Sequence, residues 1–191
     1  MTVVEIYTEE TPNPASLKFV TNLHLLPNYV AEFKTKEAAT ESELAQQLFE
    51  IPFVQAVFIS NNFVTVTKKK ELEWYEITPE IKECIRQFLV AGKNAVSDTL
   101  RAKANVVIDT KTAGEDPASK IIALLDKYVK PAVEGDGGHI QFRSFENGVV
   151  SVALQGSCSG CPSSNITLKN GIEGLLKRMV PEVTEVVAIA E

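Results

Sequence analysis

Two cysteines separated by two residues are the part of this sequence best suited to chemistry. Cys158 and Cys161 lie in the run Gly156-Ser157-Cys158-Ser159-Gly160-Cys161-Pro162. Two thiolates at this spacing can hold one metal ion or one edge of a metal cluster, or they can form a redox-active disulfide. A closed zinc site or an iron–sulfur cluster usually has four protein ligands. The pair therefore supplies half of such a site.

The rest of the sequence offers few further ligands, namely Cys84, His24 and His139. Cys84 shares a predicted helical face with apolar residues, so we expect it in a core. His24 lies in an apolar stretch and is expected to be structural. His139 stands at the head of a predicted strand, where a surface position is favoured over a place at the site. Because one chain cannot complete the site, our hypothesis is a twofold homodimer that presents Cys158 and Cys161 twice.

Two other interpretations of the pair stay open. In the first, the dithiol belongs to a thiol oxidoreductase, since thioredoxin-type pairs also lie between a strand and a helix. Those pairs typically follow an aromatic residue and enclose a proline, whereas here Ser157 precedes the pair and Pro162 follows it. In the second, the pair is an inert structural turn in an adaptor protein.

The elements that must position the pair can be predicted from periodicity. An apolar strand at 149–154 precedes it, and a helix follows in which Pro162 suits the first position and Cys161 is a candidate N-cap. Upstream we expect a helix from about Pro117 capped by Asp116, a glycine-rich turn at 134–139 and a hairpin at 147–148. With a last strand at 183–189, the helices should cover one face of a three-stranded sheet in the order α-β-β-α-β.

The first half of the sequence predicts a second small layer of helices and strands. Strand signals occur near 4–6 and 17–19, and residues 54–59 and 63–67 should form a hairpin. Helices are expected at 41–50 with Ser42 as cap, and from Pro79 with Thr78 as cap. Residues 93–115 are small and polar and are typical of a linker. We therefore predict an α+β protein with two small α/β sandwich domains, at 1–92 and 116–191, joined by a linker at 93–115.

Composition excludes several classes of function. The 191 residues are 45% hydrophobic and 23% charged, with a net charge of −6, which is ordinary for a globular protein. The single basic run, at 68–70, is followed at once by acidic residues, so nucleic acid is not an expected partner. No apolar run approaches the ~20 residues that cross a bilayer, so no membrane is expected either. The first residues resemble neither a secretory signal nor a transit peptide, which leads us to expect a cytoplasmic protein.

The residues around the pair also resemble a known family. Residues 154–164, 166–173 and 180–183, together with the turn Asp136-Gly137-Gly138, are similar to the NifU C-terminal domain of Nfu-type iron–sulfur proteins. Residues 11–19, 42–45 and 63–67 resemble the Nfu N-terminal domain. The family commonly has an acidic residue after the two glycines, whereas this sequence has His139.

This resemblance implies an iron–sulfur cluster scaffold or carrier and not an enzyme. It implies that Cys158 and Cys161 are the ligands of a [4Fe–4S] cluster held between two protomers. The partners would be upstream cluster-assembly proteins and the apo iron–sulfur proteins that receive the cluster. Without the resemblance, the residues do not separate [4Fe–4S] from [2Fe–2S].

Overall fold

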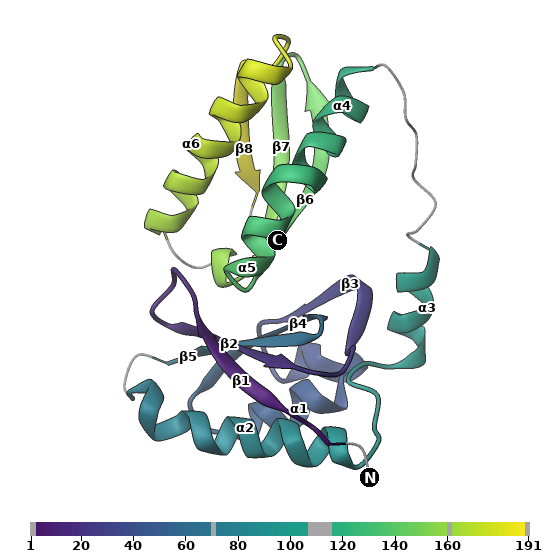
Figure 1. The fold of residues 1–191 in the computed structure, drawn as a ribbon, viewed down its shortest axis with the longest axis vertical. Coiled ribbons are helices and arrows are strands. Elements are labelled where there is room, and N and C mark those ends of the chain that lie inside the picture. Colours follow the sequence, from purple (N-terminus) through teal and green to yellow (C-terminus); the bar gives the residue numbers. More distant parts are fainter. Residues whose placement is uncertain (1–2, 70–71, 107–115, 160–161, 190–191) are drawn as a thin grey trace. The chain divides into compact units, whose positions relative to one another are not determined.

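A computed structural model describes residues 3–69, 72–106, 116–159 and 162–189. The chain forms two compact units, Met1–Thr110 and Lys111–Glu191, and each is described here by itself (Figure 1). Each unit combines helices with one sheet. The expected α+β class with two small α/β layers is therefore confirmed. In the described ranges, no helix is both long and apolar enough to cross a bilayer.

Unit 1 contains a five-stranded antiparallel sheet in the order β1-β2-β5-β4-β3. The strands are β1 Ile6–Glu10, β2 Ser16–Thr21, β3 Leu26–Phe33, β4 Val54–Asn61 and β5 Phe63–Lys68. The helices are η1 Glu37–Glu41, α1 Glu43–Phe49, α2 Trp74–Val90 and α3 Asp98–Val106. The expected hairpin at β4–β5 and the cap of α1 are confirmed, since Ser42 Oγ accepts the Ala45 N–H at 3.0 Å.

The core of unit 1 lies between one face of this sheet and the helices. Alternate residues of the strands point to the same face, and the apolar ones pack against the inner faces of α1 and α2. The fully buried members include Phe19, Val57, Ile59, Val64, Leu44, Leu48, Ile81 and Ile85. The periods of the sequence therefore predict which side chains enter the core.

The predicted start of the second helix was wrong. Helix α2 begins at Trp74, because Glu73 and Glu76 form a capping box in which the Glu73 N–H donates to the Glu76 carboxylate at 3.1 Å. Pro79 lies inside the helix, and the Thr78 hydroxyl donates to the Trp74 carbonyl at 2.6 Å instead of capping the chain. Pro79 is the sixth residue of α2, and its missing N–H removes one backbone hydrogen bond, but the helix continues to Val90.

Part of the segment expected to be a linker is folded. Ala95 and Val96 are buried in the core of unit 1, and Leu100 of α3 packs against the same core. The Ser42 hydroxyl donates to the Ala95 carbonyl at 2.6 Å, which ties this segment to the start of α1. Residues 107–115 lie outside the described residues, and the bounds of the two domains stay predictions.

Unit 2 has the element order expected for it. Its helices are α4 Pro117–Leu124, a π-helical turn η3 Leu125–Val129, α5 Lys130–Gly135, η4 Ser157–Ser159 and α6 Pro162–Met179. Its strands are β6 Gly138–Glu146, β7 Val149–Gly156 and β8 Glu185–Ile189, in the order β6-β7-β8. Strand β7 is antiparallel to β6 and parallel to β8. The caps and turns also agree, because Asp116 accepts the Ser119 N–H at 3.1 Å and Asn147 and Gly148 have φ of 51° and 82°.

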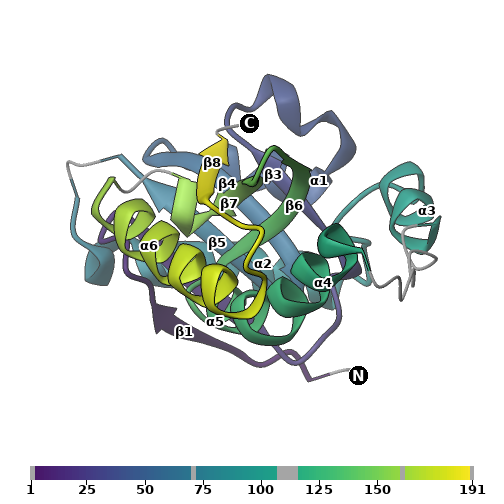
Figure 2. The ribbon, with the colours of Figure 1, turned by 90° about the horizontal axis from the view of Figure 1, so that it is seen from above.

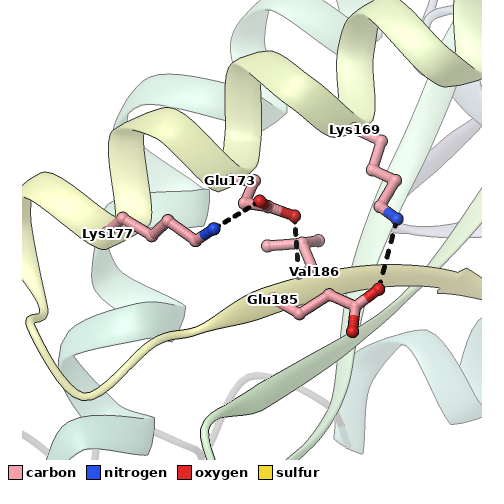
Figure 3. A network of polar contacts seen from close by, with 5 residues as sticks. All are labelled: Lys169, Glu173, Lys177, Glu185 and Val186. Atoms are coloured by element: carbon pink, nitrogen blue, oxygen red, sulfur yellow. Dashed lines mark hydrogen bonds and ion pairs between the residues drawn. The ribbon is translucent and has the colours of Figure 1, made fainter.

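Polar contacts hold α6 against the edge strand β8 (Figure 3). The Glu173 carboxylate accepts the Val186 N–H at 3.1 Å and the Lys177 ammonium at 2.6 Å. Lys169 forms a 3.6 Å ion pair with Glu185. Among the described strands β8 pairs only with β7, so Glu173 satisfies a backbone donor at the sheet's edge. The middle of the helix that follows the cysteine segment is thus tied to β8 at Lys169 and Glu173.

Candidate functional site

Cys158 lies in η4, where β7 ends and the chain turns toward α6. Its side chain is 4% exposed and belongs to the apolar core of unit 2, together with Leu154 and Ile140. Helix α6 begins at Pro162, which confirms the predicted first helical position. Cys161 lies outside the described residues, so its place as N-cap and its distance from Cys158 stay predictions.

A glycine provides the space that the Cys158 side chain occupies. Gly138 opens β6 and pairs with Gly156 at the end of β7. A Cβ atom at Gly138 would lie 2.9 Å from Cys158 Sγ and 2.7 Å from the Gln155 carbonyl oxygen, and both separations are too short for ordinary contacts. Any larger residue at 138 would therefore displace the thiol or the backbone of β7.

The Asp136-Gly137-Gly138 turn is bonded directly to the cysteine turn. The Ser157 hydroxyl donates to the Asp136 carbonyl, and the Ser157 N–H donates to the Gly137 carbonyl at 3.3 Å. Gly137 has a φ of 77°, a conformation that glycine adopts without strain. These two turns, which are far apart in the sequence, are therefore joined by hydrogen bonds next to Cys158.

The same serine places a hydroxyl beside the thiol. Ser157 Oγ lies 3.8 Å from Cys158 Sγ, a weak sulfur hydrogen bond. Because the Ser157 O–H proton is donated to the Asp136 carbonyl, the Cys158 S–H is the donor in this contact and the serine oxygen accepts. The α6 N-terminus begins four residues after Cys158, and its backbone N–H groups favour negative charge in the same region.

His139 is close in sequence to these turns but points elsewhere. It follows Gly138 in β6, and neighbouring residues of a strand project from opposite faces. Its side chain is 14% exposed, and its Nδ1 lies 3.8 Å from Glu134 Oε1. The structure thus places His139 half-buried beside Glu134, where a surface position was expected, and does not bring it to Cys158.

The remaining candidate ligands lie in unit 1. Cys84 is on α2 and packs against the core, as predicted, and its burial together with the nearby Glu80 carboxylate raises the pKa of its thiol. His24 is exposed, and its Nδ1 lies 3.0 Å from Asn61 Oδ1. Within the described ranges, no three His, Cys, Asp or Glu side chains gather around one point.

The sequence indicates the parts that support Cys158 but not their contact. Gly137 and Gly138 predict a turn, and Ser157 is the residue before Cys158. Their contact follows from the register Gly138↔Gly156. That register is set by the whole β6–β7 hairpin and not by residues near either cysteine.

Comparison with known proteins shows which family this chain belongs to. Residues 6–92 match the family model described as the N terminus of the scaffold protein Nfu/NifU, and residues 121–187 match the NifU-like domain. The chain is 40% identical over 183 residues to the human protein named NFU1 iron-sulfur cluster scaffold homolog, mitochondrial, covering 93% of this chain and 69% of that protein. The chain belongs to the Nfu/NifU family.

Other relatives carry the same name. The Drosophila persimilis protein is 40% identical over 182 residues, which is 95% of this chain and 64% of the relative. A NifU-like protein from Saccharomyces cerevisiae, solved by NMR in solution, is 29% identical and covers 50% of this chain and 87% of its own, with a TM-score of 0.43. That score is too low to bear on the fold.

The expectation of a cytoplasmic protein is contradicted. The human and Drosophila relatives are named as mitochondrial proteins. The expectation depended on the composition of the first residues, which does not decide where a protein of this family resides. We withdraw it.

Proposed function

We propose that this protein is an iron–sulfur cluster scaffold that binds a cluster through Cys158 and Cys161 and passes it to apo-proteins. The observation that carries the proposal is the position of Cys158. It lies on a turn that is hydrogen-bonded to the Asp136-Gly137-Gly138 turn, and its sulfur packs directly against Gly138. The relatives named as iron–sulfur cluster scaffolds support it. The cluster is the cargo of the protein and not a permanent part of it.

The donor set fits an iron–sulfur cargo. Thiolates are soft ligands that suit iron–sulfur clusters. One chain supplies two thiolates of the pair, which is half the set that a [4Fe–4S] cluster takes. Two protomers related by a twofold axis would supply four, so we propose one [4Fe–4S] cluster per dimer.

Sharing the cluster between two copies would make it easy to release. When the copies separate, each keeps only two of the four ligands, and a client with its own cysteines can capture the cluster. The residues of this chain then have two tasks: to hold Cys158 in place through Gly138 and Ser157, and to favour thiolate near the start of α6. Neither task requires catalytic turnover.

Anaerobic reconstitution of the full chain with ferrous iron and sulfide tests the proposal. We expect a brown dimer by native mass spectrometry with one [4Fe–4S] cluster per two chains, and transfer of that cluster to an apo-[4Fe–4S] protein. Cys158→Ala and Cys161→Ala should each abolish loading. Cys84→Ala is the matched control, because Cys84 lies in unit 1 among core residues, and it should load like the wild type.

Three results would refute the proposal. They are a stable cluster in a monomer, loading that survives removal of both cysteines of the pair, and disulfide reductase turnover by metal-free protein that is lost in Cys158→Ala. The last result would support a thiol oxidoreductase in its place.

A further inference from the structure

The two edge strands of the unit 1 sheet, β3 and β1, differ in how well their backbone groups are protected from pairing with a further strand. At the β3 edge, the register with β4 shifts between Leu26 and Val30, Pro27 lacks an N–H, and Asn28 has a φ of 59°. Helix α3 also packs against β3. Bulges, prolines and covering helices are the usual means by which an edge is kept from pairing with another strand.

The β1 edge has none of these features. All five residues of β1 pair with β2 in an unbroken antiparallel register, from Ile6↔Thr21 to Glu10↔Leu17. Among the described strands, β1 has no second neighbour, and it runs along the rim of unit 1 (Figure 2). A regular edge strand presents backbone N–H and C=O groups that can accept a further strand.

A shallow cleft lies beside this edge, between β1 and the first half of α2. Its floor and walls combine apolar and hydroxyl groups with a few charges. The lining residues are Thr8, Glu10, Leu17, Trp74, Tyr75, Thr78, Pro79 and Lys82. Strand addition needs such a neighbouring pocket, because main-chain bonds give affinity while side-chain pockets give specificity.

The aromatic wall of the cleft is already in place. The Trp74 indole N–H donates to the Pro14 carbonyl at 2.9 Å, and the Lys68 ammonium lies 5.7 Å from the centre of its ring. Tyr75 beside it is 79% exposed, the highest value among the large hydrophobic side chains of the described chain. A fixed indole next to an exposed phenol is the kind of aromatic surface that dominates binding energy at interfaces.

The charge around the cleft favours one class of occupant. Carboxylates outnumber ammonium groups around the cleft. The acidic residues of β1 with its preceding residue, and of α2 up to residue 83 with its cap, are Glu5, Glu9, Glu10, Glu73, Glu76, Glu80 and Glu83. The basic residues beside them are Lys82, Lys68, which lies over the Trp74 ring, and Lys18, which pairs with Glu9 at 2.8 Å. Complementary charge speeds and orients association, so a basic segment is favoured over an acidic one.

We propose that the β1 edge of unit 1 is a docking site for an extended basic peptide segment of a partner protein. The segment adds an antiparallel or parallel strand to β1, places an apolar side chain between Leu17 and the aromatic wall, and sets its basic side chains against the carboxylates. The β1 edge belongs to unit 1 and Cys158 to unit 2, and the proposal does not depend on the proposed cluster function.

Fluorescence anisotropy with the full chain tests this proposal. The probe is a labelled peptide Lys-Val-Lys-Phe-Lys-Val-Lys, compared with one carrying Glu in place of each Lys and with one carrying Pro in place of each Val. We expect saturable binding of the first peptide alone, with slower hydrogen exchange at residues 6–10 in its presence. Tyr75→Ala and Glu10→Lys should each raise the Kd at least about fivefold.

Matched controls lie in unit 2. Tyr128→Ala and Glu182→Lys change an exposed residue of the same type and should leave the Kd unchanged. Circular dichroism must show that all four variants are folded. The proposal is overturned if the proline peptide binds as tightly as the valine peptide, if residues 6–10 gain no protection, or if both unit 1 variants bind like the wild type.

Discussion

Each unit contains a cysteine whose surroundings the structure describes, and the two surroundings differ in kind. Cys84 lies on the long helix α2, half-buried against the core of unit 1, with Glu80 one turn away. Burial and that carboxylate raise the pKa of its thiol, which favours the neutral form. Cys158 lies on a short turn at a strand end, against Gly138 and beside the Ser157 hydroxyl.

The difference shows what turns a cysteine into a candidate ligand. Both side chains contact apolar residues, and Cys158 is the more buried of the two, so solvent exposure does not mark it as the candidate ligand. What separates them is the local backbone. A helix interior gives Cys84 no free N–H groups, because they bond to carbonyls within the helix. The turn before α6 places Cys158 near the start of a helix, where backbone N–H groups lack partners within the helix. Three experiments test whether the surroundings of the two cysteines differ in this way.

The largest effect is expected from Gly138→Ala. The new methyl group would meet the Gln155 carbonyl oxygen at 2.7 Å and Cys158 Sγ at 2.9 Å, so the backbone of β7 must shift. Overpacking of this kind costs ~1–3 kcal/mol. We expect a lower free energy of unfolding for unit 2 in urea, followed by circular dichroism, and reduced cluster loading at the displaced thiol.

Gly171→Ala provides the matched control for that variant. Gly171 lies in the middle of α6, and a Cβ there would meet no atom within 4 Å. Replacing a glycine in an open helix position stabilises a protein by about 0.5–1 kcal/mol. If both alanine variants were equally stable, the close packing of Gly138 against Cys158 would be wrong.

A smaller effect is expected at Cys84, measured as the rate of alkylation by iodoacetamide and followed by peptide mass mapping. Because the pKa of Cys84 is raised, chiefly by burial and secondarily by Glu80, its thiolate should form only at higher pH than in the urea-unfolded chain. Glu80→Gln removes the carboxylate and should move the rate profile to lower pH. Glu182→Gln, in unit 2, should not move it. Equal rates at pH 7 in folded and unfolded chains would contradict the assignment.

Much of the fold follows from local residue chemistry. The hairpins at 61–62 and 147–148, the caps at Ser42 and Asp116, and the start of α6 at Pro162 were predicted because each depends on residues adjacent in the sequence. Strand β3 was not predicted, since Pro27 and Asn28 interrupt its pattern. The start of α2 was predicted at Pro79 because Thr78-Pro79 has the composition of a helix start. The helix in fact begins at Trp74, where Glu73 and Glu76 form the capping box.

The sequence names candidate ligands for the site but does not predict what supports them. The Cys158 and Cys161 spacing and the resemblance named the pair, and it stays a proposal. The contact between Gly138 and Cys158 depends on β6–β7 register. Gly138 and Cys158 are far apart in the sequence, so their contact can be seen only once the β6–β7 hairpin is formed.

The smallest effect is expected from Glu173→Gln, in the helix that follows Cys158. Hydrogen bonds from Lys177 and from the Val186 N–H lower the pKa of Glu173 below its usual value of 4.5 (Figure 3). A carboxyl whose pKa is lower in the folded state stabilises the fold above the unfolded pKa, and this contribution is lost as pH falls through the folded pKa. The urea midpoint of Glu173→Gln should therefore lie below that of the wild type at pH 7, and the difference should shrink as the pH falls below 4.5. Glu182→Gln should match the wild type throughout. A difference between Glu173→Gln and the wild type that is independent of pH would contradict this prediction. It would mean that packing, and not the charge of the Glu173 carboxylate, holds α6 against β8.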